Sequence, residues 1–175
     1  MINTYWARTR TDGRSGKDTS YRGHLDYTGD RYSFQLERLV IGDNFNPEMG
    51  FLRRDDMRKS FGQFRFSPRP ASIKAIRKFS GTGAFTYIEN GAGRLDTRAL
   101  DSEFAIEFQN NDRFSVGANA TYEFLPNPVA IAPTVTIPIG GYDYASVRTG
   151  FNPGQQRRVA GFVLAEYGTF YDGHK

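Results

Sequence analysis

The chain has 175 residues, of which 23 are Lys or Arg and 19 are Asp or Glu, so its formal net charge is +4. It has no cysteine and 2 histidines, which excludes disulfides, thiol chemistry and Cys-ligated zinc and argues against a His-rich metal centre. Aromatic residues make up 15% of the chain and 19 residues are glycine, a composition that favours strands and turns over helices.

Apolar and polar residues alternate in one segment after another, which indicates strands with two different faces. The clearest run is 114–124, in which Phe114, Val116 and Ala118 alternate with serine, glycine and asparagine. Residues 100–109 alternate in the same way, and the polar turn between the two runs predicts a hairpin. In chain order we expect strands at about 2–11, 20–28, 31–41, 57–66, 77–89, 100–109, 114–124, 142–151 and 157–171.

The connections between these strands differ in length. Longer loops at 42–56 and 125–141 roughly alternate with tight turns at Gly29 and Asp30 and near Asn111. This rhythm is typical of an outer-membrane barrel, which has short turns on the periplasmic side and longer loops outside. A soluble sandwich has no reason to keep it.

Several strands are long enough to cross a bilayer at a tilt. No run of about 18 apolar residues occurs, so no transmembrane helix is expected, and strands cross lipid only as a closed barrel. Polar residues on the second face suit a lumen. Aromatic residues gather near the strand ends, where they would form an interfacial girdle: Tyr5 and Trp6, Tyr21 and Tyr27, residues 61–66, Tyr122 and Phe124, and residues 167–171.

The sequence therefore predicts an all-β protein, an antiparallel up-and-down sheet that is part of a transmembrane β-barrel. Because bacterial single-chain barrels have even strand numbers and the pattern gives about nine strands, we expect residues 1–175 to be a single partial barrel domain, a fragment of a larger barrel. A soluble β-sandwich with one wet face is the alternative that the same alternation allows.

Several longer motifs resemble a bacterial family. They are residues 40–58 (VIGDNFNPEMGFLRRDDMR), 61–70 (FGQFRFSPRP), 5–11 (YWARTRT), 87–91 (YIENG), 137–142 (IPIGGY) and 166–174 (EYGTFYDGH). The chain is similar in these segments to the C-terminal domain of the family catalogued as domain of unknown function 5916.

The resemblance implies an outer-membrane-type barrel that follows a signal peptide and a carbohydrate-binding module similar to family 9. It also implies that this N-terminal sugar-binding module and some C-terminal strands lie outside the chain. The family has no established catalytic residues, so the resemblance assigns none here.

A basic stretch interleaved with aromatics has the residue types of a nucleic-acid site. It comprises Arg53, Arg54, Arg58 and Lys59, with Arg65 and Arg69 among Phe61, Phe64 and Phe66. Asp55 and Asp56 offset the positive charge, and the whole chain carries only +4, so we expect no nucleic-acid partner. Internal ion pairs are the favoured explanation, with contacts to anionic lipid headgroups as the alternative.

Carboxylates on one strand face are candidates for the acid pair of a glycosidase. Glu103 and Glu107 would stand about 13 Å apart along a strand, too far for the separation of about 5–9.5 Å that glycoside hydrolysis uses. Asp101 and Glu103 come closer to that range, but acids two residues apart occur on any polar strand face. We therefore expect no catalytic residue and no enzyme activity.

Other polar groups give weaker signals. Residues 26–30 and 43–48 are rich in the oxygen ligands that calcium prefers, but the first segment lacks the glycine and glutamate of an EF-hand loop. For the second an Asx turn is the favoured explanation, with a calcium-stiffened loop as the alternative. His24, beside Arg22 and Asp26, is expected to be solvated. We expect no catalytic, cofactor or metal site and no cofactor.

These observations predict a non-catalytic segment of a barrel in the bacterial outer membrane. It would anchor or connect a carbohydrate-binding or uptake system, with outer-membrane lipid as its partner and glycans reached through the N-terminal module outside this chain. The alternative function is a soluble β-sandwich that binds carbohydrate through exposed tyrosines and Trp6.

Overall fold

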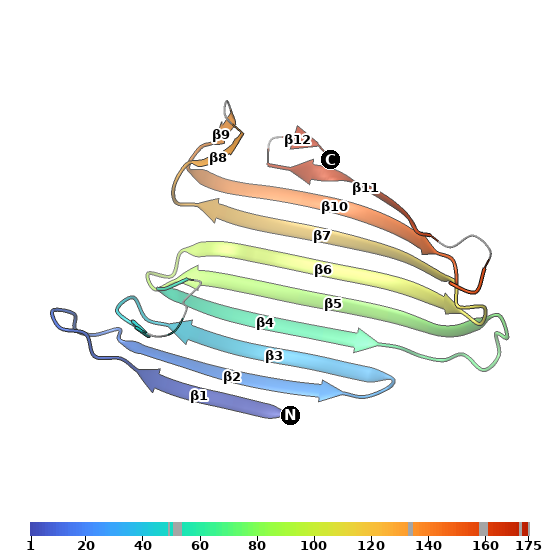
Figure 1. The fold of residues 1–175 in the computed structure, drawn as a ribbon, viewed down its shortest axis with the longest axis horizontal. Helices are drawn as coiled ribbons and strands as arrows, with labels where there is room; N and C mark the ends of the chain where they lie inside the picture. Colours follow the sequence, from blue (N-terminus) through green and yellow to red (C-terminus); the bar gives the residue numbers. More distant parts are fainter. Residues whose placement is uncertain (49, 51–53, 133–134, 158–160, 172, 175) are drawn as a thin grey trace.

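A computed structural model describes the chain apart from residues 49, 51–53, 133–134, 158–160, 172 and 175. The described residues form strands, turns and bends, without a helix of the length and hydropathy that a membrane span requires. Ten strands build one sheet in the order β1-β2-β3-β4-β5-β6-β7-β10-β11-β12 (Figure 1). Every pairing in it is antiparallel, which confirms the all-β, up-and-down architecture.

The strands of the main sheet have the following bounds: β1 Ile2–Arg8, β2 Thr19–Thr28, β3 Tyr32–Ile41, β4 Met57–Phe66, β5 Ile76–Asn90, β6 Leu95–Phe108, β7 Arg113–Leu125, β10 Gly140–Asn152, β11 Val163–Phe170 and β12 Gly173–His174. A separate two-stranded sheet is formed by β8, Val129–Ala132, and β9, Val135–Ile137. The strands β1 and β12 lie at opposite edges and do not pair with each other. The described sheet is therefore open.

Each of the predicted strands has a counterpart, but some ends differ. The first strand ends at Arg8 rather than residue 11, where the chain enters a loop with Gly13 and Gly16 at positive φ. The last long strand begins at Val163, later than the predicted 157. The sequence analysis missed the hairpin β8–β9 and the short strand β12. Proline at 126, 128 and 138 made that hairpin look like a loop, because proline usually interrupts strands.

The sheet is a single layer. The extensive contacts between described elements run between strands that are neighbours in the two ladders, so no second layer of strands covers either face among the described residues. The buried hydrophobic residues are Ile41, Ala105, Leu125 and Ile137. Within the described residues, neither face of the main sheet is therefore covered by a second layer.

The turns at one end of the sheet are tied to one another. In the turn between β6 and β7, Asp112 is 6% exposed, and its carboxylate accepts hydrogen bonds from the Gly154 amide at 2.8 Å and from Asn110 at 2.9 Å. The Arg157 guanidinium also donates to both carboxylate oxygens. Asp112 thereby fastens this turn to the connection between β10 and β11.

Asp112 is expected to make stability depend on acid pH. The Gly154 amide, followed by the Arg157 guanidinium, holds the pKa of Asp112 below its ordinary value of 3.8. A carboxyl group whose pKa is lower in the folded than in the unfolded protein stabilises the fold fully at any pH above its unfolded pKa. This contribution is lost as the pH falls through its folded pKa. Asp112→Asn is therefore less stable at neutral pH and loses less stability below about pH 4. Unfolding midpoints measured over this range check it, and identical pH profiles for the two proteins would contradict it.

Candidate functional site

The sheet has two chemically different faces. Directly opposite residues of antiparallel neighbours point to the same side, so the registers assign each side chain to a face. One side, here called the apolar face, carries Leu25, Tyr27, Tyr32, Phe34, Leu36, Phe64, Phe66, Phe79, Phe85, Leu100, Phe104, Ile106, Phe114, Val116, Ala118, Ala120, Ala145, Val147, Phe151, Val163, Ala165 and Tyr167.

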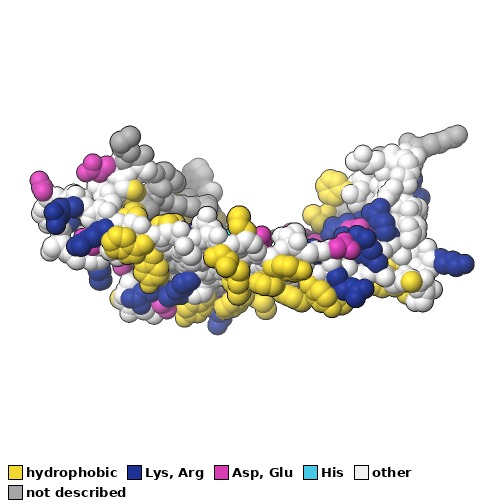
Figure 2. Space-filling view, turned by 90° about the horizontal axis from the view of Figure 1, so that it is seen from below, with side chains coloured by type: hydrophobic (Ala, Val, Ile, Leu, Met, Phe, Trp, Pro, Cys, Tyr) yellow, Lys and Arg dark blue, Asp and Glu magenta, His cyan; other side chains and the backbone are white. Residues whose placement is uncertain are grey.

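The apolar face is exposed and free of charge across a wide band. Phe64 and Leu100 are both 52% exposed and Val147 is 55% exposed. On β6 the band extends from Leu100 to Phe108, about 27 Å at about 3.4 Å per residue. None of the described side chains on this part of the face is Asp, Glu, Lys or Arg. Figure 2 shows hydrophobic side chains gathered in the middle of the molecule and basic side chains towards both ends.

A charged row borders the band on the side of the loops after β1, β3 and β7. Its members on the apolar face are Arg38, Arg58, Glu89, Arg98 and Asp143. Arg38 and Arg58 approach one carboxylate, Glu89, at 4.0 and 3.6 Å, and Arg98 lies 3.6 Å from Asp143. The row therefore contains more arginines than acids.

Aromatic rings stack at the opposite border of the band. Tyr27 and Phe34 have ring centroids 5.5 Å apart, and Tyr32 and Phe66 have theirs 5.1 Å apart. These rings come from strands β2, β3 and β4 next to the short turn at 29–31. The band thus lies between a charged row on one side and stacked aromatics on the other.

The predicted aromatic clusters are divided between the two faces. Trp6 is opposite Tyr21 on the apolar face, but Tyr5 is on the other side, where its hydroxyl lies 3.0 Å from Ser20 Oγ. Phe61 is also on the polar side, with the Lys59 ammonium 5.4 Å from its ring centre. Grouping adjacent aromatics into one girdle was wrong for these residues, because successive side chains of a strand alternate in direction.

The opposite side, here called the polar face, carries ion clusters, and one of them lies on β2, β3 and β4. Glu37, 8% exposed, accepts hydrogen bonds from Arg22 Nε at 2.7 Å and Lys59 Nζ at 2.9 Å. His24 Nδ1 lies 3.7 Å from Glu37, and the His24 side chain is only 10% exposed. The expectation of a solvated His24 is therefore wrong, since Arg22 and Glu37 on the same face cover it.

A second cluster accounts for the carboxylates weighed as a glycosidase pair. Glu103 receives a hydrogen bond from Arg113 at 2.6 Å and lies 3.8 Å from Arg148. Asp101 accepts a hydrogen bond from Asn119 at 2.8 Å, and Glu107 lies 3.1 and 3.2 Å from Arg77 and Lys78. The acids thus share the polar face, as the alternation predicts, and cross-strand cations and amides engage them.

The sequence analysis did not identify a tyrosine cluster at the end of this face. The hydroxyls of Tyr171 and Tyr144 donate to Glu123 at 3.0 and 3.4 Å, and the rings of Tyr171 and Tyr142 meet edge to face at 5.1 Å. Burial, with the hydrogen bond to Glu123, raises the pKa of Tyr171 to about 12. Tyr171 also adopts a φ of 52°, a backbone conformation that sequence pattern does not reveal.

The basic stretch near residue 53 is only partly inside the described residues, because Arg53 is not among them. Arg54 donates to Asp96 at 2.6 Å, and Arg69 donates to Asp30 at 2.7 Å. These are the internal pairs that the sequence analysis favoured. Phe64 and Phe66 lie on the apolar face, whereas Phe61 and Arg65 lie on the polar face, so the register divides this stretch between the two sides of the sheet.

The oxygen-rich loop 43–48 uses its polar groups to hold a neighbouring loop. The Asn44 side chain donates to the carbonyls of Ser15 and Gly16 at 3.3 and 2.9 Å, and the Asn46 amide donates to Thr9 Oγ1 at 3.0 Å. Within the described part of the chain, no group of three or more His, Asp or Glu residues gathers in a geometry for a metal ion.

Comparisons with known proteins give no match: no family model, curated protein or solved structure matches this chain. The resemblance to the family catalogued as domain of unknown function 5916 therefore stays a prediction.

Proposed function

We propose that this chain forms part of the wall of a transmembrane β-barrel in the bacterial outer membrane. The apolar face contacts lipid and the polar face lines a lumen. The barrel acts without catalysis, as a membrane anchor or conduit.

The observation that carries this proposal is the exposed band without charge on the apolar face. Its extent of about 27 Å along β6 corresponds, at the strand tilt of about 40° in outer-membrane barrels, to about 21 Å along the membrane normal, most of their apolar zone of about 25 Å. The charged row and the stacked aromatics lie where such a zone would end. The ion clusters on the polar face suit a lumen, because charges facing lipid are costly there.

The single layer favours a barrel wall over the soluble sandwich. A sandwich would cover Phe64, Leu100 and Val147, but these side chains are half exposed. We propose that the two edges of the sheet, at β1 and at β11 beyond its short pairing with β12, pair in the closed barrel with strands outside this chain. The main sheet of the described residues contains ten strands rather than the expected nine, so an odd strand number does not support this part of the proposal. It rests on the open edges, which proteins seldom leave uncovered.

The link to carbohydrate is a further part of the proposal and depends on the family resemblance. In that arrangement an N-terminal sugar-binding module outside this chain captures a glycan, and the barrel holds the module at the membrane or passes the glycan inward. Nothing in the polar face requires a particular sugar.

The full-length protein tests this proposal. Extracted from membranes with mild detergent, it should migrate faster on a gel before boiling than after boiling, since a closed barrel stays compact until it is heated. The Asp30→Asn variant, changed at an exposed ion pair, should behave like the wild type. A protein that is recovered in the soluble fraction without detergent and migrates identically before and after boiling would contradict the proposal.

A further inference from the structure

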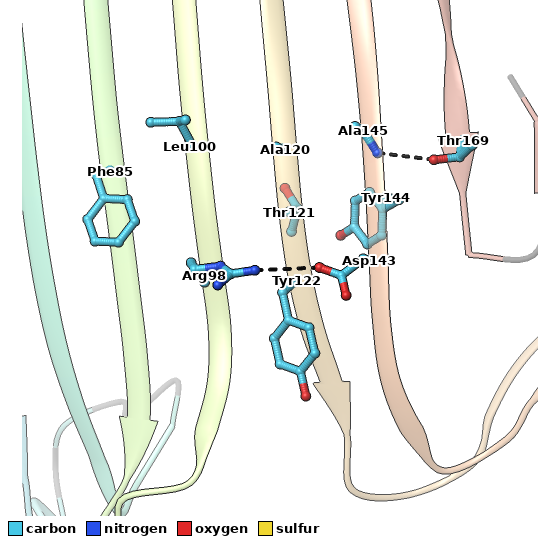
Figure 3. Close-up of a pocket in the computed structure, with 10 residues that line it drawn as sticks. All are labelled: Phe85, Arg98, Leu100, Ala120, Thr121, Tyr122, Asp143, Tyr144, Ala145 and Thr169. Atoms are coloured by element: carbon cyan, nitrogen blue, oxygen red, sulfur yellow. Dashed lines mark hydrogen bonds and ion pairs between the residues drawn. The ribbon is translucent and has the colours of Figure 1, made fainter.

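The apolar face is hollowed where small side chains meet. Ala120 on β7 and Ala145 on β10 form the floor of a depression of about 490 Å³, with Phe85 and Leu100 on one side and Thr169 on the other (Figure 3). A second hollow of about 480 Å³ shares this floor and continues over Ala118 towards Val147 and Tyr167. Together they form an apolar groove that follows the strands for about 14 Å, at about 3.4 Å per residue.

A cation lies at one end of this groove. Arg98 on β6 and Asp143 on β10 face each other across β7 beside Tyr122 (Figure 3). They form an ion pair at 3.6 Å, with 53% of the Arg98 side chain and 75% of the Asp143 side chain exposed. An exposed pair of this kind is weak, so a stronger anion can compete with Asp143 for the guanidinium.

Within the groove Arg98 and Asp143 balance each other, but the charged row to which they belong favours an anion. On the same face, Arg38 and Arg58 share the single carboxylate of Glu89, so the charged row as a whole has a positive excess. At the other end the groove opens onto a band without charged side chains. An occupant that matches both parts has a negatively charged head and an apolar tail.

We propose that this groove is a binding site for an anionic phospholipid, whose acyl chain lies over Ala120 and Ala145 and whose phosphate pairs with Arg98. The proposal rests on the proposed function, because it requires the apolar face to be in a membrane. A guanidinium is a strong partner for phosphate oxygens, and a cation at a membrane surface contributes about 1 kcal/mol to the binding of anionic lipid.

The test compares the full-length protein in vesicles of phosphatidylcholine alone and in vesicles where phosphatidylglycerol replaces part of it. Native mass spectrometry after detergent extraction counts the retained lipids. Arg98→Gln should lower the preference for phosphatidylglycerol about fivefold, the effect of one cation worth about 1 kcal/mol. Asp143→Asn should raise the preference, because it releases Arg98 from its competitor. If the ion pair is purely structural, both variants should instead be less stable than the wild type and show the same lipid preference.

Arg148→Gln is the matched control. Its guanidinium is also 53% exposed and also pairs with a carboxylate, but it lies on the polar face. It should retain lipids as the wild type does, and excess inorganic phosphate should not displace the retained lipid. The proposal fails if Arg98→Gln and the wild type show the same preference, or if a second copy of the chain occupies the groove in cross-linking. If the protein enters neither type of vesicle, the proposed function itself fails.

Discussion

Val147→Arg should lower the free energy of unfolding from a bilayer by about 2–4 kcal/mol, the cost of a cation at the middle of the lipid-facing surface of a barrel. Val147 lies between Ala118 on β7 and Tyr167 on β11, inside the band without charge. Its side chain has no acidic neighbour on that face to pair with. Denaturant titration of the full-length protein in lipid vesicles measures the loss.

Thr4→Arg is the control for this experiment. Thr4 is on the same face but in the row of Arg38, opposite Gly23, at the border of the band. A cation near the interface of a barrel costs about 0–1 kcal/mol. Val147→Arg should therefore lose several times more unfolding free energy than Thr4→Arg. In a soluble protein an exposed valine is replaced within about 0.5 kcal/mol, and equal small effects at both sites would contradict a lipid-facing surface.

Glu37→Gln should destabilise the protein by about 2–3 kcal/mol, because hydrogen bonds between charged groups contribute about 1.5–3 kcal/mol each. The substitution keeps the shape of the side chain but removes the charge that Arg22 and Lys59 share. Glu37 is 8% exposed, whereas Arg22 is 33% and Lys59 30% exposed, so the two cations regain part of their hydration and the loss is moderate.

The comparison for Glu37 is Asp30→Asn. Asp30 and Arg69 are 69% and 60% exposed, and exposed pairs contribute about 0–1 kcal/mol. In urea unfolding in detergent, the midpoint of Glu37→Gln should therefore lie at a clearly lower urea concentration than the midpoint of Asp30→Asn. Similar midpoints for the two variants would mean that the cluster on the polar face is as weak as a surface ion pair.

The strands and their faces could be predicted from sequence because both follow from local alternation. In the run 114–124 every second residue is apolar, and the structure places Phe114, Val116 and Ala118 together on one face of β7. The same period identified Asp101, Glu103 and Glu107 as neighbours on the other face. Hairpin turns between such runs then fix the order of strands in a meander.

The partners of these residues could not be predicted, because they depend on register between strands. Glu37 meets Lys59 because the register places Glu37 opposite Phe61, and Lys59 is the adjacent residue of β4 on the same face. The sequence does not specify this alignment. The same is true of Asp112, which is 42 residues from Gly154. The groove over Ala120 and Ala145 could not be predicted for the same reason. It forms where small residues of two strands lie side by side between larger residues of the neighbouring strands.

Two single-cysteine variants give the most direct test of the lipid-facing surface, because the natural chain has no cysteine. Val116→Cys and Ser115→Cys are neighbours on β7 at nearly the same depth, but they point to opposite faces. In lipid vesicles a fluorophore on Cys at 116 should be quenched by nitroxide-labelled lipid and shielded from aqueous quencher. A fluorophore at 115 should show the reverse. Equal access of the aqueous quencher to both positions would contradict the account.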